Sequence, residues 1–405
     1  MGDYCDLYTN REISSQFLYC DLVTRALTSP IHCSVNRSAS LGYPWKEDNP
    51  SRRQPKKDKK PGASKPFNPL RSAFEMHSNW LTEFKQIHPE YTTVNANVLQ
   101  QSLRHVDKAF NDFFTKKSGY PNFKKHKDVS FEYPPGASIN ITGNHITFPG
   151  LGTMRFFKSR SIPESWEIRT VTVSLDADGS YVSVLLRDET LPELLIKTLE
   201  ECETIQGCDV GIKKLVALSD GTIIKNPRFH QKAERRLAIQ QRRVSRKQKG
   251  SSNRKKAALR LARTHQKVRR QREDYQWKTG KQIASNADIS TFEDLNVKGM
   301  LARCKPKKDP ITGKYVKNGQ SAKAGLNRAI SDAAWYSLRL KTEHQAKKLG
   351  NLVITVDPKY TSQECPECHH ISSGNRDKEK FICTECDYAE DADVNGAKNQ
   401  VNRGE

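Results

Sequence analysis

Long apolar stretches are missing from this 405-residue chain, and only 35% of its residues are hydrophobic. No run approaches the roughly eighteen apolar residues that a membrane helix needs. Residues 1–30 also lack the basic start and apolar run of a secretory signal. We therefore expect a cytoplasmic protein without membrane contact, long enough for two or three domains.

Negative charge is also in short supply. Lys and Arg number 68 against 46 Asp and Glu, which gives a formal net charge of +22. Such an excess repels itself unless a polyanion neutralises it. Nucleic acid is the expected partner, and a charge that merely keeps the chain in solution is the weaker alternative.

The cysteines form no general disulfide framework. Six of the ten are scattered and are expected to be plain thiols: Cys5, Cys20, Cys33, Cys202, Cys208 and Cys304. The other four form Cys-x2-Cys-x14-Cys-x2-Cys, at Cys365, Cys368, Cys383 and Cys386. This spacing predicts one structural zinc ion held by four thiolates, with no coordination position left for a catalytic water. A redox motif would instead come as a single pair near a βαβ unit.

Changes of pattern along the chain predict an N-terminal half with three parts. Residues 1–66 end in a Pro-, Lys- and Ser-rich stretch and form a basic N-terminal segment. Residues 67–120 have a helical period that includes Val98, Leu99 and Val106. Residues 121–200 alternate with period two around turns at Gly143 and Gly179, which predicts a small antiparallel β domain, sandwich or barrel.

The second half predicts an α/β core with a mixed sheet. Residues 201–360 hold strands, a basic helical hairpin at 228–280, a polar loop at 305–325 and a helix at 326–349. Within 228–272 there are eighteen Lys or Arg and one Glu, so this hairpin needs an anionic surface beside it. The zinc ribbon is expected at 361–388, and residues 389–405 complete the core.

Three acids are placed at or near the end of a predicted strand or the start of a helix in this core. They are Asp209, Glu293 and Asp393. Converging carboxylates bind two divalent cations in enzymes that hydrolyse phosphodiesters. Each acid taken alone is more simply a helix cap or a surface charge.

Three stretches carry a family resemblance. "CDVGIKKLVALSDG" and "FEDLNVKGM" resemble the first two motifs of RuvC-type nuclease domains, which have an RNase H-like fold. "YTSQECPECHHISSGNRDKEKFICTECDYAEDADVNGAKNQ" resembles the third motif with its inserted zinc ribbon. Together they resemble the TnpB/OrfB proteins of insertion sequences, relatives of compact type V CRISPR effectors. The likeness spans about residues 68–400, with a helical recognition lobe and a wedge-type β-barrel upstream, while residues 1–37 align with nothing in the family.

The resemblance implies roles for individual residues. Asp209, Glu293 and Asp393 would be the catalytic acids and would hold two Mg²⁺ ions. Asp393 is chosen over its neighbour Asp391 because the family's acid lies two residues before an Asn, here Asn395. Arg376 matches a ribbon arginine that approaches the active site, although a plain surface arginine is an equal alternative.

The function implied is that of an RNA-guided, Mg²⁺-dependent endodeoxyribonuclease associated with a transposable element, acting at the nucleoid of a prokaryotic cell. Its partners would be a guide RNA, target double-stranded DNA and the displaced single strand. Phosphates would contact basic residues of the hairpin: Arg242, Arg243, Arg246, Lys247, Arg254, Lys255 and Lys256. Trp277 would stack on bases or, as the simpler alternative, pack in the core.

Two other functions stay open from the sequence. One is a guide-directed repressor that binds DNA without cleaving it. The other is a structure-selective nuclease or transposase that acts without RNA. The sequence does not choose between a monomer and a dimer.

Overall fold

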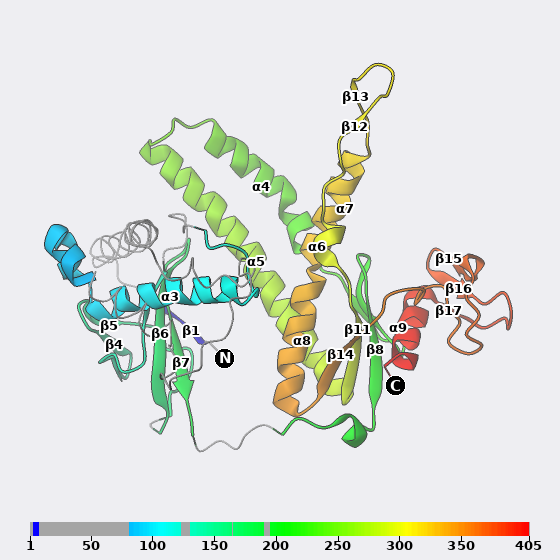
Figure 1. Ribbon diagram of the computed structural model, residues 1–405, viewed down its shortest axis with the longest axis horizontal. Helices are drawn as coiled ribbons and strands as arrows, with labels where there is room; N and C mark the ends of the chain where they lie inside the picture. The colour runs from blue at the N-terminus through cyan, green and yellow to red at the C-terminus, as the bar shows by residue number, and fades with distance from the viewer. Residues whose placement is uncertain (1–2, 8–80, 123–129, 164, 190–194, 405) are drawn as a thin grey trace, which may run out of the picture. The chain divides into compact units, whose positions relative to one another are not determined.

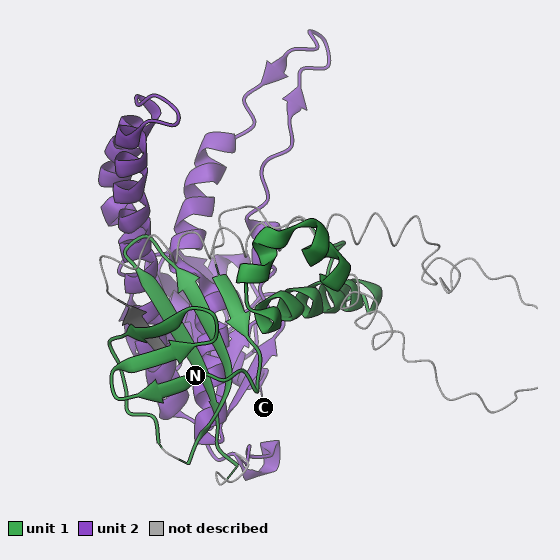
Figure 2. Cartoon of the chain, turned by 90° about the vertical axis from the view of Figure 1, so that its left-hand side faces the viewer, with its two compact units in different colours: residues 1–191 green, residues 192–405 purple. Residues whose placement is uncertain are grey.

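The computed structural model describes residues 3–7, 81–122, 130–163, 165–189 and 195–404. The chain divides into two compact units, 1–191 and 192–405 (Figure 2). Apart from residues 3–7, the predicted basic segment 1–66 lies outside the described residues. The finer six-part division expected from the sequence stays a prediction.

The first unit packs a helix against two antiparallel sheets. The helix is α3 (Ala96–Phe114), which Asn95 caps by accepting a hydrogen bond from Asn97 N. One sheet has the order β1-β7-β6-β2: Asp3–Leu7, Ser180–Arg187, Glu167–Leu175 and Ser130–Tyr133. The other contains β3 (Asn140–Thr142), β4 (His145–Phe148) and β5 (Gly152–Arg155). Side chains from the helix and both sheets share one hydrophobic core.

Most local expectations for this unit are confirmed. Val98, Leu99 and Val106 are buried on one face of α3. The hairpins β3–β4 and β6–β7 turn at the predicted glycines. The described strands form two separate sheets, so the wedge-type barrel stays a prediction. Strand β1 pairs with β7 although the sequence pattern gives no sign of it.

The second unit is built on a five-stranded mixed sheet, as predicted (Figure 1). The order is β10-β9-β8-β11-β14: Ile223–Lys225, Lys214–Leu218, Ile205–Val210, Ile289–Glu293 and Leu352–Val356. Strands β8, β9 and β10 are antiparallel neighbours, whereas β11 runs parallel to both β8 and β14. The carboxyl ends of β8, β11 and β14 therefore lie at one edge of the sheet.

Six helices accompany this sheet. They are α4 (Phe229–Ser245), α5 (Ser252–Asn286), α6 (Val297–Met300), α7 (Gln320–Ala333), α8 (Trp335–Leu349) and α9 (Ala392–Asn402). Helix α5 packs on α8, and α9 packs on β8. Among the described helices, none is both long and apolar enough to cross a lipid bilayer.

Two predictions for this unit need correction. The helix expected at 326–349 is two helices, α7 and α8, separated at Ala334, whose φ is 51°. The polar loop expected at 305–325 contains a short hairpin, β12 (Lys307–Lys308) and β13 (Tyr315–Val316), and the start of α7. The predicted basic helical hairpin is confirmed as α4 and α5, although α5 continues to Asn286.

The zinc-ribbon region forms a three-stranded sheet of its own. Its strands are β15 (Arg376–Asp377), β16 (Lys380–Ile382) and β17 (Ala389–Asp391). Phe381 is fully buried with Cys365 and Cys383 in a small core. This core is too small for much apolar burial, so a metal ion is the expected source of its stability.

Candidate functional site

Three separate segments bring the predicted acids to one edge of the sheet. Asp209 is the second-last residue of β8, and Glu293 ends the neighbouring parallel strand β11. The register pairs Cys208 with Phe292, so the two acids follow adjacent paired positions. Asp393 lies in the first turn of α9, which packs on β8. Gly396 of α9 lies directly beside Asp209, since a Cβ there would be 3.3 Å from Asp209 Oδ2.

Burial and neighbouring carboxylates shift the pKa of Asp209. Burial raises the pKa of Asp209 well above its usual value, and the charges of Glu293 and Asp393 raise it further. Burial also raises the pKa of Glu293, against a hydrogen bond from Thr361 that lowers it. A bound cation would add to Arg376 and Lys214 in offsetting the repulsion that the charges of Glu293 and Asp393 exert on Asp209.

Two cations of the chain contact Asp393. Arg376 Nη2 lies 3.2 Å from Asp393 Oδ1, and Lys214 Nζ lies 3.2 Å from Oδ2. Arg376 begins β15 of the ribbon, so the predicted arginine does lie beside the acids. Lys214 is not among the predicted residues, because a lysine in so basic a chain carries no local signal of a special position.

Asp391 has a different place from Asp393. Its carboxylate caps α9 by accepting hydrogen bonds from the backbone N–H groups of Asp393 and Val394. Lys214 Nζ lies 2.7 Å and 2.6 Å from its two oxygens. Burial raises the pKa of Asp391, but the bonds from Lys214 and the α9 amides outweigh burial and lower it. Asp391 therefore fixes the start of the helix that carries Asp393.

The donor chemistry of the three acids fits hard divalent cations such as Mg²⁺, which prefer carboxylate oxygens. Among the described residues, only the four cysteines form a set of three or more candidate ligands gathered within 4.8 Å. The carboxylates do not form so tight a set, and Asp393 is paired with Lys214 and Arg376 instead.

The four cysteines fit zinc closely. Cys365 Sγ and Cys386 Sγ are 3.6 Å apart, and Cys368 Sγ and Cys383 Sγ are 3.5 Å apart. A tetrahedron with Zn–S bonds of about 2.3 Å has edges of about 3.8 Å. Burial opposes ionisation of Cys383, but the backbone N–H groups of Cys386 and Glu385 outweigh it and lower its pKa to about 6.

The predicted phosphate-contacting residues lie on α4, α5 and their connection. All are exposed except Arg254, which is half-buried. Arg254 Nη1 donates to Val244 O at 2.9 Å and to Lys247 O at 3.1 Å, so it also closes the hairpin. Trp277 is 39% exposed and meets His344 edge-on at 5.4 Å, which makes it neither a core residue nor a fully free ring.

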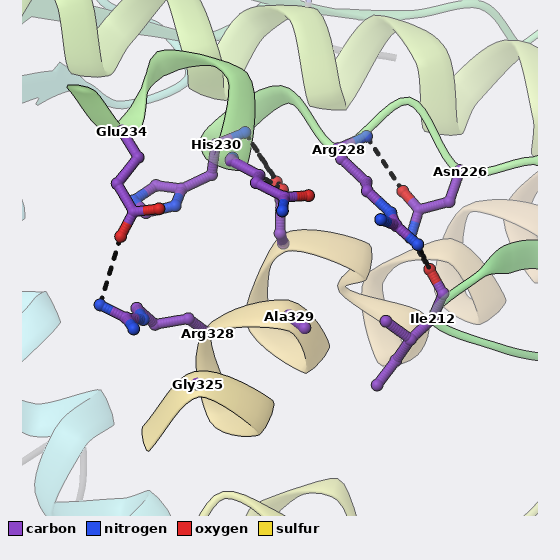
Figure 3. Close-up of a pocket in the computed structure, with 10 residues that line it drawn as sticks. Ile212, Asn226, Arg228, His230, Glu234, Gly325, Arg328 and Ala329 are labelled. Atoms are coloured by element: carbon purple, nitrogen blue, oxygen red, sulfur yellow. Dashed lines mark hydrogen bonds and ion pairs between the residues drawn. The ribbon is translucent and has the colours of Figure 1, made fainter. Parts of the chain in front are cut away.

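A pocket of about 280 Å³ lies between α4 and α7 (Figure 3). Its charged residues have partners within the pocket: Arg328 Nη1 lies 3.2 Å from Glu234 Oε1, and Asp332 accepts from the backbone N–H groups of His230 and Gln231. None of the three acids lines it. The pocket is therefore best described as the joint that holds the basic hairpin against α7.

Comparisons with known proteins agree with this fold. The OrfB_IS605 family model, described as "Probable transposase", matches residues 188–303, and the Cas12f1-like TNB domain matches residues 335–400. A solved Cas12f1–sgRNA–target DNA complex contains a chain with the same fold, at a TM-score of 0.55 and 15% identity, covering 97% of this chain and 83% of that one.

Two curated relatives are similar over most of their length. The Escherichia coli (strain K12) protein "Putative RNA-guided DNA endonuclease InsQ" is 33% identical over 81% of this chain and 79% of its own. A Streptomyces pristinaespiralis protein, "Putative RNA-guided DNA endonuclease", is 33% identical over 82% of this chain and 78% of its own. The fold and site thus define an α/β protein with a four-cysteine ribbon in a region that matches the Cas12f1-like TNB domain. The chain belongs to the TnpB/OrfB family.

Proposed function

We propose that this protein is an RNA-guided DNA endonuclease associated with a transposable element. The observation that carries the proposal is the convergence of Asp209, Glu293 and Asp393 from three segments at one sheet edge, in a chain whose relatives bear that name. Guide RNA would pair with the target strand, and the protein would hold the hybrid by its backbone and shape. The exposed cations of α4 and α5 suit phosphate contacts, which carry no sequence information.

The chemistry assigned to the site is phosphodiester hydrolysis. Asp209, Glu293 and Asp393 would hold two Mg²⁺ ions, which when bound lower the pKa of a water and stabilise the leaving oxygen. Arg376 brings a planar guanidinium to the same place from the ribbon, where it can neutralise a phosphate oxygen of the strand being cut. The products expected of this nuclease class are 5′-phosphate and 3′-hydroxyl ends.

The test is cleavage of a plasmid that matches the guide, by the protein purified with its RNA. Asp209→Ala is expected to abolish cleavage while target binding remains. Asp274→Ala is the matched control, since Asp274 is an exposed helix residue that pairs, among the described residues, with Lys278 at i,i+4. Unchanged cleavage by the Asp209 variant would overturn the site assignment.

Copurified nucleic acid separates the remaining alternatives. A discrete RNA that ends in a variable guide is expected, and its absence from an active preparation would favour a nuclease or transposase that needs no RNA. Guided binding without any cleavage by the unaltered protein would favour the repressor.

A further inference from the structure

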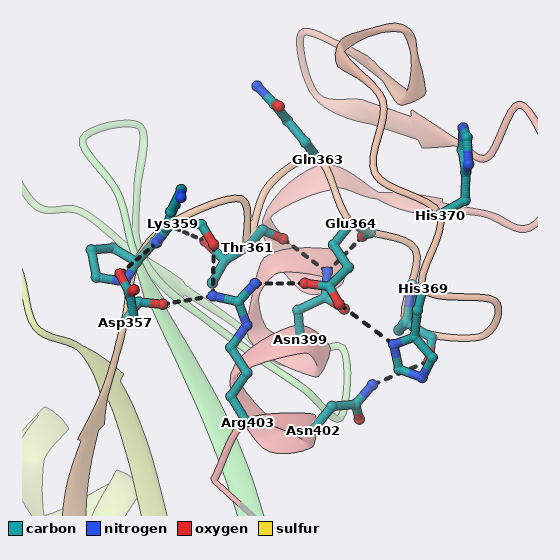
Figure 4. Close-up of polar contacts among 12 residues, drawn as sticks. Asp357, Lys359, Thr361, Gln363, Glu364, His369, His370, Asn399, Asn402 and Arg403 are labelled. Atoms are coloured by element: carbon teal, nitrogen blue, oxygen red, sulfur yellow. Dashed lines mark hydrogen bonds and ion pairs between the residues drawn. The ribbon is translucent and has the colours of Figure 1, made fainter.

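One face of α9 is lined with hydrogen-bond donors that all reach the same stretch of chain (Figure 4). We call Asn395, Asn399, Asn402 and Arg403 the α9 clasp. Their spacing places them above one another on a single helix face. The clasp donates to five backbone carbonyls within residues 357–366, namely those of Asp357, Lys359, Thr361, Glu364 and Pro366.

The stretch held by the clasp, which we call the connecting segment, links two parts of the site. It follows β14, whose last residue Val356 pairs with Glu293, and it runs to the first zinc ligand, Cys365. Five of the ten carbonyls of residues 357–366 accept from clasp side chains. Its path is therefore set by the clasp more than by the sheet.

Thr361, in the middle of this segment, contacts one of the acids. Its hydroxyl donates to Glu293 Oε1 at 2.6 Å, and Pro358 O lies farther away, at 3.1 Å. The residue is only 3% exposed, and Asn399 Nδ2 holds its carbonyl at 2.8 Å. Because a β-branched side chain has few rotamers, a fixed backbone here also fixes the hydroxyl.

We propose that Thr361 is a positioning residue for Glu293 and that the α9 clasp holds Thr361 in place. The inference rests on the proposed nuclease function. Helix α9 then controls two of the three acids: it carries Asp393 in its own first turn and orients Glu293 through Thr361. A carboxylate whose one oxygen is held by a hydroxyl keeps the direction of its other lone pairs, as ligands of metal sites require.

The α9 clasp also holds the residue that precedes the first cysteine of the zinc ribbon. Glu364 immediately precedes Cys365, and its carbonyl accepts from both Asn395 at 3.0 Å and Asn399 at 2.6 Å. Its carboxylate lies 2.5 Å from Arg403 Nη2. The anchor of the first zinc ligand and the orientation of Glu293 thus depend on one set of donors.

The experiment compares Thr361→Val, which removes the donor at nearly constant volume, with Thr361→Ser, which keeps it. Two quantities are measured on the full protein with its RNA: the Mg²⁺ concentration for half-maximal cleavage, and direct binding of Mn²⁺ alone, taken above the level of the Asp209→Ala variant. Loss of a residue that orients a metal ligand typically costs 10- to 100-fold in metal affinity or activity. We expect at least about a tenfold shift for valine and a return to within about threefold for serine.

Thr342→Val is the matched control. Thr342 is a fully buried threonine of the same unit, and its hydroxyl bonds only Leu338 O, at 3.1 Å within α8. Its valine variant is expected to leave both metal measurements unchanged. The control thus shows that losing a buried hydroxyl elsewhere does not by itself alter metal binding.

Two results for the Thr361 variants would overturn the proposal. Unchanged Mn²⁺ binding and Mg²⁺ dependence in Thr361→Val would show that the hydroxyl does not orient Glu293. Equal losses in the valine and serine variants, together with lower melting temperatures, would show a purely structural role. If Thr361→Val fails to fold, Arg403→Gln loosens the segment from its other end, and unchanged Mn²⁺ binding there contradicts the proposal. If the unaltered protein does not cleave, the proposed function fails, while Mn²⁺ binding still decides the role of Thr361.

Discussion

Lys214, the first residue of β9, and Lys213 just before it have opposite surroundings. Lys214 is 18% exposed at its side chain and contacts both Asp391 and Asp393, whereas Lys213 is 75% exposed and pairs with the exposed Glu379. Burial lowers the pKa of Lys214, but its bonds to Asp391 and Asp393 outweigh burial and raise it. Lys214 is thus a fixed charge between the sheet and the start of α9.

Replacing each lysine by methionine is expected to lower the free energy of unfolding by different amounts. Lys214→Met leaves Asp391 partly buried without its partner, which costs about 1–3 kcal/mol in the free energy of unfolding. Lys213→Met removes an exposed ion pair and is expected to cost less than about 1 kcal/mol. Urea unfolding measures both, and equal effects would contradict the special place given to Lys214.

Asp288, which is not one of the three acids of the site, makes the stability of the fold depend on pH. Its carboxylate accepts hydrogen bonds from Lys197 Nζ, the N–H groups of Glu203 and Thr204, and the Thr204 hydroxyl. The bond from Lys197 is the main cause that lowers the pKa of Asp288. Since the folded state binds the proton less readily than the unfolded state, the stabilisation is complete above the unfolded pKa of about 3.9 and is lost as the pH falls.

Asp288→Asn is therefore expected to lower the melting temperature at pH 7. The difference from the unaltered protein is expected to shrink once the pH falls below about 4. Melting curves between pH 7 and pH 3 check this, and a difference that grows on acidification would contradict it.

At the scale of elements, the position of α9 depends on a glycine of β8. A Cβ on Gly207 would lie 1.7 Å from Ala397 O, which no real contact allows. Gly325, inside α7, has nothing within 4 Å of the place where a Cβ would lie. Gly207 is therefore required by close packing, whereas nothing in the space around Gly325 requires a glycine.

Alanine at these two positions is expected to act in opposite directions. Gly207→Ala must push α9 from the sheet and is expected to cost about 1–3 kcal/mol or more in the free energy of unfolding. Gly325→Ala should stabilise α7 by up to about 1 kcal/mol. Chemical unfolding gives both values, and a tolerated alanine at 207 would mean that α9 does not pack on β8 as described.

The break between α7 and α8 shows where sequence patterns stop being informative. No Gly or Pro marks it, and the apolar period runs through Ala334 without interruption. The break is fixed by distant groups: Gln276 Nε2 donates to the carbonyls of Ala333 and Ala334, and Trp335 Nε1 donates to Gly211 O. By contrast, the Cys-x2-Cys spacing and the acids at strand ends are patterns within short stretches of sequence, so they could be recognised from the sequence alone.

At the scale of the whole molecule, the zinc ribbon joins the core through the connecting segment before it and α9 after it. Arg376 and Asp391 of its own strands add contacts with Asp393 and Lys214. Loss of the metal from the ribbon should therefore change the positions of the acids. The clasp cannot hold the connecting segment in one path if the segment's far end at Cys365 becomes free.

Zinc removal is expected to impair guided cleavage although every carboxylate is intact. We expect about one zinc ion per chain by elemental analysis, and faster hydrogen exchange in residues 361–391 after chelation. Cys304→Ser, at a thiol outside the cluster, is the control and should retain both metal and activity. A zinc-free preparation that cleaves at the normal rate would refute this coupling.

The hydrogen bond from Cys208 N to Gln400 Oε1 joins residues 192 positions apart. A ribosome releases β8 and β11 long before α9, so the growing chain holds Asp209 and Glu293 but neither Asp393 nor the helix that orients them. Contacts of such sequence separation form late in folding. The order of synthesis thus leaves the proposed metal site without its third acid until residues 392–402 have emerged.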